Sequence, residues 1–128
     1  MEAAGVIVNK PDGTLLMVTE KRKEFYGQLN FPSGRKEENE TLEQCARREA
    51  EEETGLFVKI VRKFSSFRIN LRGMELDVTL FYAEVLEGNL RPGEDILKAE
   101  FLSLAEIGRR DLIDHAVIRI ANEFLMRK

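Results

Sequence analysis

The sequence predicts an α/β fold in which helices cover both faces of a mixed β-sheet. Two observations indicate this fold. Short apolar runs typical of strands lie on both sides of one amphipathic helix, and the chain then ends in a helical segment. The chain has 128 residues, of which 43% are hydrophobic, so it can bury a core and has the size of one domain. We therefore expect a single domain over residues 1–128.

The N-terminal part of the chain has the pattern of three strands separated by polar segments. Between the first two, the Pro-Asp-Gly sequence that ends at Gly13 favours a tight chain reversal. Pro32 ends the third strand because it cannot donate a backbone hydrogen bond. The expected strands are residues 3–8, 14–19 and 29–31, with a charged loop at residues 20–28.

The next helix is marked at both ends by its own residues. After a loop at residues 33–40, Thr41 is suited to cap the helix, and Gln44, three residues later, completes a capping box. Gly55 readily takes the left-handed conformation that ends a helix. We therefore expect the helix to run to about Thr54.

The rest of the chain alternates apolar runs with turn residues before it becomes helical. A turn at residues 70–73 would join two long strands into a hairpin. In the last expected helix, Leu112, Ala116 and Ile120 share one face. The expected elements are strands at residues 57–67, 74–86 and 96–102, a loop at 89–95, and helices at 104–109 and 111–126.

Composition excludes several classes of protein. The formal net charge of −3 gives no basic surplus for binding duplex nucleic acid. The only cysteine, Cys45, cannot form an internal disulfide, and with the only histidine, His115, it cannot complete a zinc site. No apolar run reaches the roughly 20 residues that span a bilayer, and the N-terminus does not have the pattern of a secretory signal. We expect a soluble, cytoplasmic protein.

The capped helix carries three glutamates, Glu49, Glu52 and Glu53, at positions i, i+3 and i+4. In a helical projection, Glu49 and Glu53 fall within about 20° of Leu42, and Glu52 falls beside Cys45. The acids therefore prolong the apolar stripe of the helix instead of opposing it. Like charges at this spacing repel each other and raise each other's pKa, so they favour a shared cation.

Solvation and ion pairing account for these acids less well than a metal does. A solvated face accounts for Glu43 and Glu51 on the outer arc, but not for the inward acids. Ion pairing with Arg47 and Arg48 has the poorer orientation, because both arginines precede the acids along the helix. Carboxylate oxygens suit Mg²⁺ or Mn²⁺, and a main-chain carbonyl at Ser33 could complete the shell. We therefore expect a metal site here.

The residues around these acids follow a fixed spacing. They are Gly34, Glu40, Arg48, Glu49, Ala50, Glu52, Glu53, Gly55 and Leu56. This pattern resembles the signature of the Nudix hydrolase family, with Ala50 a small choice for an aliphatic position. The resemblance extends to residues 29–34, where Ser33 stands in place of the commoner Gly, and to residues 101–107, where Phe101 stands in place of Trp. It implies an α/β/α sandwich with a mixed sheet.

The resemblance also implies a reaction. Family members hydrolyse a pyrophosphate bond in a nucleoside diphosphate linked to another group, with water as the nucleophile and Mg²⁺ or Mn²⁺ as the cofactor. The metal ligands that it implies are Glu49, Glu52, Glu53 and the Ser33 carbonyl. Arg48 would orient a carboxylate through a charge-assisted hydrogen bond, and Glu40 would belong to the same network.

The sequence leaves the general base and the substrate open. The base is Glu52 or Glu53, or an acid of the later Pro-Gly loop, Glu94 or Asp95. Several side chains could meet a substrate ring or phosphate, and each also suits a core or surface role. They are Phe25, Tyr26, Phe67, Lys21, Arg22, Arg68 and Arg72. The expected partner is a small-molecule diphosphate, bound by a monomer or homodimer. The alternatives are a small non-nucleotide diphosphate as substrate, and a non-catalytic Nudix domain that binds a ligand or a protein.

Overall fold

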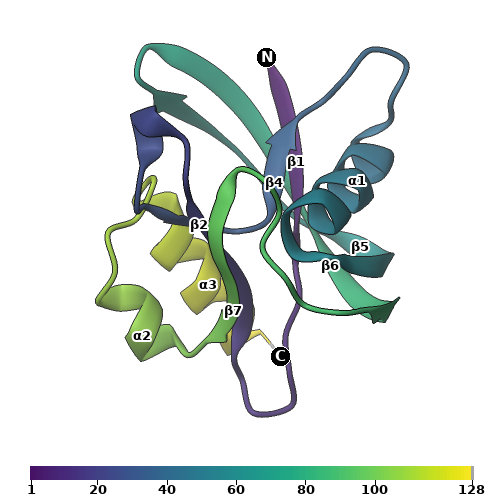
Figure 1. Ribbon diagram of the computed structural model, residues 1–128, viewed down its shortest axis with the longest axis vertical. Coiled ribbons are helices and arrows are strands. Elements are labelled where there is room, and N and C mark those ends of the chain that lie inside the picture. The colour runs from purple at the N-terminus through teal and green to yellow at the C-terminus, as the bar shows by residue number, and fades with distance from the viewer. Residues whose placement is uncertain (128) are drawn as a thin grey trace.

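The computed structural model of the chain describes residues 1–127, and β-sheets form its centre (Figure 1). The strands are β1 (Glu2–Ile7), β2 (Leu15–Glu20), β3 (Leu29–Asn30), β4 (Ser33–Arg35), β5 (Leu56–Leu71), β6 (Met74–Gly88) and β7 (Ile96–Leu102). The helices are α1 (Leu42–Thr54), α2 (Leu104–Gly108) and α3 (Ala116–Met126), with a 3-10 turn, η1 (Lys23–Phe25). None of these helices within residues 1–127 is long and apolar enough to cross a membrane.

The strands divide between two sheets. The four-stranded sheet has the order β4-β1-β6-β5 and is mixed, because β1 runs parallel to β6 and antiparallel to β4. The three-stranded sheet has the order β3-β2-β7 and is antiparallel. Helix α1 lies on one side of the molecule, and α2 and α3 lie on the other (Figure 1). The predicted α/β/α arrangement is confirmed, with the difference that its strands form two sheets.

The core lies on both sides of β1. Ala4 and Val6 belong to the apolar cluster beneath α1, whereas Ala3 and Ile7 belong to the cluster that packs against α3. A strand buried on both faces needs apolar side chains at successive positions, which explains its unbroken apolar run. Because Ala46 of α1 belongs to the first cluster, the packing of β1 also fixes the helix that carries the acids.

The local signals for α1 are confirmed. The Thr41 side chain accepts a hydrogen bond from the Gln44 N–H at 3.0 Å, and the Gln44 side chain accepts one from the Thr41 N–H at 2.8 Å. Gly55 follows the helix with a φ of 77°, in the left-handed region. The reciprocal cap and the glycine therefore fix both ends of the helix.

The strand expected at residues 57–67 runs further, to Leu71, because β5 pairs with β6 as far as the Leu71–Met74 pair. Three other segments differ because they pair with a distant strand. Residues 33–40 are not all loop, because β4 pairs with β1. Glu20 belongs to β2 instead of the charged loop, because β2 pairs with β7 along its whole length. Helix α3 begins at Ala116, later than predicted, because Leu112 pairs with Leu29 in an isolated β-bridge.

Candidate active site

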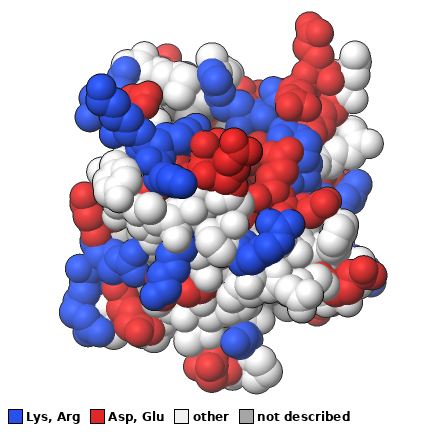
Figure 2. Space-filling view, in the orientation of Figure 1, with Lys and Arg blue, Asp and Glu red and all other residues white. Residues whose placement is uncertain are grey.

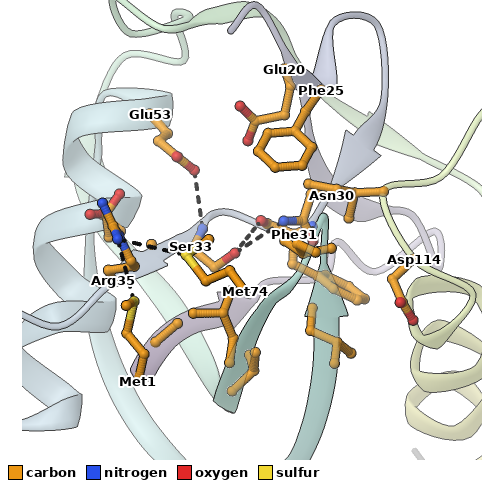
Figure 3. Close-up of a pocket in the computed structure, with 18 of the residues that line it drawn as sticks. Met1, Glu20, Phe25, Asn30, Phe31, Ser33, Arg35, Glu53, Met74 and Asp114 are labelled. Atoms are coloured by element: carbon orange, nitrogen blue, oxygen red, sulfur yellow. Dashed lines mark hydrogen bonds between the residues drawn. The ribbon is translucent and has the colours of Figure 1, made fainter. Parts of the chain in front are cut away.

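A pocket of about 850 Å³ is lined by α1, the segment after β2, the β5–β6 hairpin and the start of α3. Its acidic lining residues include Glu20, Glu49, Glu52, Glu53 and Asp95. Its apolar lining residues include Phe67, Ile69, Leu71, Met74, Leu76 and Val117. Figure 3 shows Glu53 and Glu20 on opposite sides of the upper part of the pocket, with Met74 below them. The pocket therefore joins concentrated negative charge to an apolar wall.

Arg48 connects three acids through its guanidinium. Nε donates to Oε2 of Glu40 at 2.6 Å and Nη2 donates to Oε1 at 3.0 Å, so the pairing is bidentate. Nη1 donates to Glu49 at 2.9 Å and to Glu52 at 3.1 Å. Nη2 also donates to the Arg35 carbonyl at 3.1 Å, which ties α1 to β4. The guanidinium lowers the pKa of the Glu40 carboxyl to about 2, so Glu40 is a fixed anion beside Arg48.

Glu49 and Glu53 remain in an unfavourable electrostatic environment. Burial raises the pKa of the Glu53 carboxyl well above its usual range, and the charges of Glu49 and Glu20 raise it further. Burial also raises the pKa of Glu49, and the charge of Glu52 adds to this effect. Figure 2 shows acidic side chains gathered on one face of the molecule, with Lys and Arg at their border. A cation among these acids would stabilise their ionised forms.

The backbone geometry of β4 presents Ser33 to the acids. The Val6 N–H donates to the Pro32 carbonyl at 3.0 Å, so the next pair in the ladder, Gly5 and Ser33, is a non-hydrogen-bonded pair. The N–H and carbonyl of Ser33 therefore both point away from β1. In agreement, the Ser33 N–H donates to Oε1 of Glu53 at 3.1 Å (Figure 3).

Gly34 leaves room for an acid of α1. A Cβ atom at residue 34 would overlap the Glu49 carboxyl group. The Gly34 carbonyl also accepts a hydrogen bond from the Cys45 thiol, with Sγ 3.4 Å from the oxygen. Burial raises the pKa of this thiol to about 11, and the charge of Glu40 contributes. Cys45 is therefore a core residue.

The donor set suits a hard divalent cation. Glu49, Glu52 and Glu53 supply carboxylate oxygens, and Ser33 supplies a main-chain carbonyl on the same side of β4. Within residues 1–127, no three acidic, histidine or cysteine side chains gather around one point as in a formed metal site. Instead, Glu49 and Glu52 bond to Arg48, and Glu53 bonds to Ser33. The ligand types and their unbalanced charge therefore fit a divalent cation that prefers oxygen ligands.

The remaining candidate residues fall into two groups, those that line the pocket and those that do not. Asp95 lines the pocket, whereas Glu94 is exposed and does not line it. The candidates for substrate contact that line the pocket are Phe25, Phe67, Arg22 and Arg72, and those that do not are Tyr26, Lys21 and Arg68. His115, which the sequence places inside a helix, is an exposed residue at the start of α3.

Sequence reasoning missed Glu20. This residue ends β2 with only 1% of its surface exposed, and its Oε1 accepts a hydrogen bond from Nε of Arg22 at 3.0 Å. It comes directly after the strand expected at residues 14–19, and this position in the sequence is the signal that could have identified it. A glutamate that extends a buried strand needs a partner for its charge.

A profile of the NUDIX domain matches residues 1–122. The chain belongs to the Nudix family. The spacing of glycines, acids and arginine from Gly34 to Leu56 lies inside the matched region.

Several curated relatives share sequence with this Nudix chain. Over 96 residues it is 34% identical to the ADP-ribose pyrophosphatase of Methanocaldococcus jannaschii, a match that covers 73% of this chain and 56% of the relative. Over 107 residues it is 36% identical to the NAD-capped RNA hydrolase NudC of Photobacterium profundum, with coverage of 80% and 37%. Over 105 residues it is 33% identical to the oxidized purine nucleoside triphosphate hydrolase of Danio rerio, with coverage of 80% and 65%. The chain therefore spans less than two thirds of the length of each of these relatives.

Solved structures share the Nudix fold of the whole chain. A NUDIX hydrolase from Nitrosomonas europaea superposes with a TM-score of 0.90 at 20% identity, covering 99% of this chain and 89% of the other. The MutT NUDIX hydrolase from Burkholderia pseudomallei superposes with a TM-score of 0.82 at 25% identity, covering 95% of each chain. The fold and its family are therefore shown by sequence and by structure.

Proposed function

We propose that this Nudix protein is a divalent-metal-dependent pyrophosphohydrolase that acts on a nucleotide derivative. The observation that carries this proposal is that one pocket holds both the acids of α1 and an apolar wall. A nucleoside diphosphate derivative has the matching parts, a charged diphosphate and a flat base. The names of the relatives refer to ADP-ribose, NAD-capped RNA and oxidized purine nucleoside triphosphates, which all contain nucleotides.

The residues of α1 and β4 would hold and orient the metal. Its proposed ligands are Glu49, Glu52, Glu53 and the Ser33 carbonyl. Bound Mg²⁺ or Mn²⁺ would neutralise the diphosphate and make a water molecule more acidic. Arg48 keeps Glu49 and Glu52 in place through hydrogen bonds, and the bidentate pair with Glu40 fixes Arg48 itself.

The general base, which takes a proton from the attacking water, must reach this pocket. Glu52, Glu53 and Asp95 line it and are the candidates, whereas Glu94 does not line it. Phe25 and Phe67 also line the pocket, and their rings would contact the nucleobase of the substrate.

A substrate panel tests the proposal. The purified chain is incubated with Mg²⁺ or Mn²⁺ and with ADP-ribose, NAD, nucleoside triphosphates or small non-nucleotide diphosphates, and released phosphate and nucleoside monophosphate are measured. We expect turnover of at least one nucleotide, loss of turnover in Glu52→Gln, and normal turnover in Glu51→Gln. Glu51 is a matched control because it is an exposed acid of the same helix. No turnover of any compound contradicts the proposed activity, and turnover of non-nucleotide diphosphates alone contradicts the proposed substrate class.

A further inference from the structure

Glu20 lies in the wall of the pocket that faces α1, outside the spacing that identifies the family. Among residues 1–127, no other charged residue is as little exposed as Glu20, at 1% of its surface. An isolated carboxylate in such a position loses its hydration and destabilises the fold unless positive charge compensates for the loss. The groups that compensate the charge of Glu20 therefore indicate what this residue does.

Arg22 supplies only part of the positive charge that Glu20 needs. The pair rests on one hydrogen bond, from Nε of Arg22 to Oε1 of Glu20 at 3.0 Å, and half of the Arg22 side chain (52%) is exposed. Within the described chain, Oε2 of Glu20 forms no hydrogen bond, although Glu20 lines the pocket. One oxygen of a buried carboxylate is therefore available to a ligand in the pocket.

Glu53 faces Glu20 across the pocket (Figure 3). The two acids come from β2 and α1, which belong to different layers of the fold, and like charges that face each other repel. A divalent cation between two such carboxylates reverses this effect, because both become ligands of the same positive charge.

We propose that Glu20 is a further carboxylate ligand of the metal site, contributed by the wall opposite α1. This inference rests on the proposed function, since it assumes that the acids of α1 bind a divalent metal. Binding would connect β2 to α1 across the pocket. The metal would then stabilise the two walls against each other, in addition to its role in hydrolysis.

The competing role for Glu20 is to position Arg22 for binding a substrate phosphate. The two roles differ in what happens when each residue is changed. A ligand role requires the charge of Glu20 and does not require Arg22. A positioning role acts through Arg22, so it does not affect metal binding in the absence of substrate.

The test measures Mn²⁺ binding by the full chain without substrate, by calorimetry and by electron paramagnetic resonance. The variants are Glu20→Gln, Arg22→Gln, Glu53→Gln and, as the exposed control, Glu51→Gln. We expect Glu20→Gln to weaken Mn²⁺ binding by about tenfold or more. Arg22→Gln should leave the affinity unchanged or increase it, because it removes a competing cation. Glu51→Gln should bind like the wild type.

The outcomes separate this inference from the proposed function. Wild-type affinity in Glu20→Gln, or an equal loss in Arg22→Gln, overturns the ligand role of Glu20 alone. Failure of the wild type to bind Mn²⁺, or normal binding by Glu53→Gln, overturns the metal site itself. Circular dichroism of each metal-free variant establishes that it is folded. If Glu20→Gln does not fold, Glu20→Asp, whose carboxylate is one methylene shorter, is expected to show the same loss, and unchanged binding overturns the inference.

Discussion

The two walls of the pocket are built in different ways. The α1 wall comes from the continuous segment of residues 33–55, and its groups fix one another: Arg48 bonds to three acids, and Gly34 fits against Glu49. The opposite wall is assembled from three parts that are far apart in the sequence: β2 with η1, the β5–β6 hairpin, and α3. Nε of Arg72 at the hairpin tip joins two of these parts by donating to the Glu24 carbonyl at 3.1 Å.

The α1 wall meets a requirement of the reaction, and the opposite wall meets a requirement of the individual substrate. Any diphosphate needs its charge neutralised, so a fixed arrangement of acids serves every substrate. The group attached to the diphosphate varies, and an apolar wall on a hairpin can be altered without moving the acids. Changes in the α1 wall and at Glu20 should therefore affect all substrates equally, and changes in the apolar part of the opposite wall should affect them unequally.

The largest effect is expected when the centre of the α1 wall is removed. Arg48→Ala leaves Glu40, Glu49 and Glu52 without the guanidinium that holds them. We expect kcat/KM to fall by roughly 10- to 100-fold for every substrate, because misplaced acids bind and orient the metal poorly. Steady-state kinetics with at least two substrates measure this loss.

Arg47→Ala is the matched control for this prediction. Arg47 is the exposed neighbour of Arg48 on the same helix, so its removal should leave the kinetics as in the wild type. A loss in Arg48→Ala that differs strongly between substrates would show that Arg48 contacts the substrate, against the division between the two walls.

A smaller effect is expected when the α1 wall is overpacked. In Gly34→Ala the added methyl group overlaps the Glu49 carboxyl, so the helix or the side chain must move. We expect a loss of about 1 kcal/mol in the free energy of unfolding, measured with urea, because the methyl group meets the flexible end of the Glu49 side chain. Gly108→Ala, at the end of α2, is the control, since its new methyl group meets no atom closer than 3.9 Å. Equal stability of Gly34→Ala and the wild type would mean that this wall is not tightly packed.

The sequence predicts the α1 wall far better than the opposite wall, for a physical reason. Thr41, Gln44 and Gly55 act within one or two helical turns, so the ends of α1 depend on neighbours in the sequence. The extent of β2, which buries Glu20, depends instead on pairing with β7, about 80 residues later in the chain. In the same way, the first turn predicted for α3 does not form, because Leu112 pairs with Leu29 in a β-bridge. Contacts of this kind are not encoded in local periodicity.

The opposite wall is tested by removing an aromatic side chain. Phe67→Ala removes a ring of β5 that lines the apolar part of the pocket. We expect KM to rise about tenfold for substrates whose variable group meets this ring, with kcat nearly unchanged, because the lost contact concerns binding. Kinetics with the substrates identified by the panel measure this change.

Phe57→Ala serves as the control for the aromatic change. Phe57 lies on the same strand, is 45% exposed and does not line the pocket, so its loss should not alter KM. An equal rise in KM for all substrates of the Phe67→Ala variant, or a fall in kcat alone, would contradict the selective role of this wall.

The smallest effect is the pH dependence of stability in the metal-free protein. Glu49 and Glu53 have a higher pKa in the folded chain than the ordinary value of 4.5, so folding favours their protonated forms. The melting temperature in EDTA should therefore rise by a few degrees as the pH falls from 8 toward about 5. The pKa of Glu40 is lowered to about 2, so its contribution is present above 4.5 and is lost as the pH falls from 4.5 toward 2. Below pH 4.5 the melting temperature should fall again.

Glu53→Gln shows whether the acids of α1 cause the rise. Glutamine keeps an oxygen that can accept the Ser33 N–H but carries no charge, so the variant should melt at a higher temperature than the wild type near pH 8. Its melting temperature should also change less between pH 8 and pH 5, with Glu49 responsible for the remainder. Saturating Mn²⁺ should remove the rise in the wild type, because the metal stabilises the ionised acids. The contrary result is a melting temperature of the wild type that falls steadily from pH 8 to pH 5 in EDTA. It would mean that Arg48 and Arg22 already compensate the charge of the acids of α1. The α1 wall would then not need a metal to balance its charge.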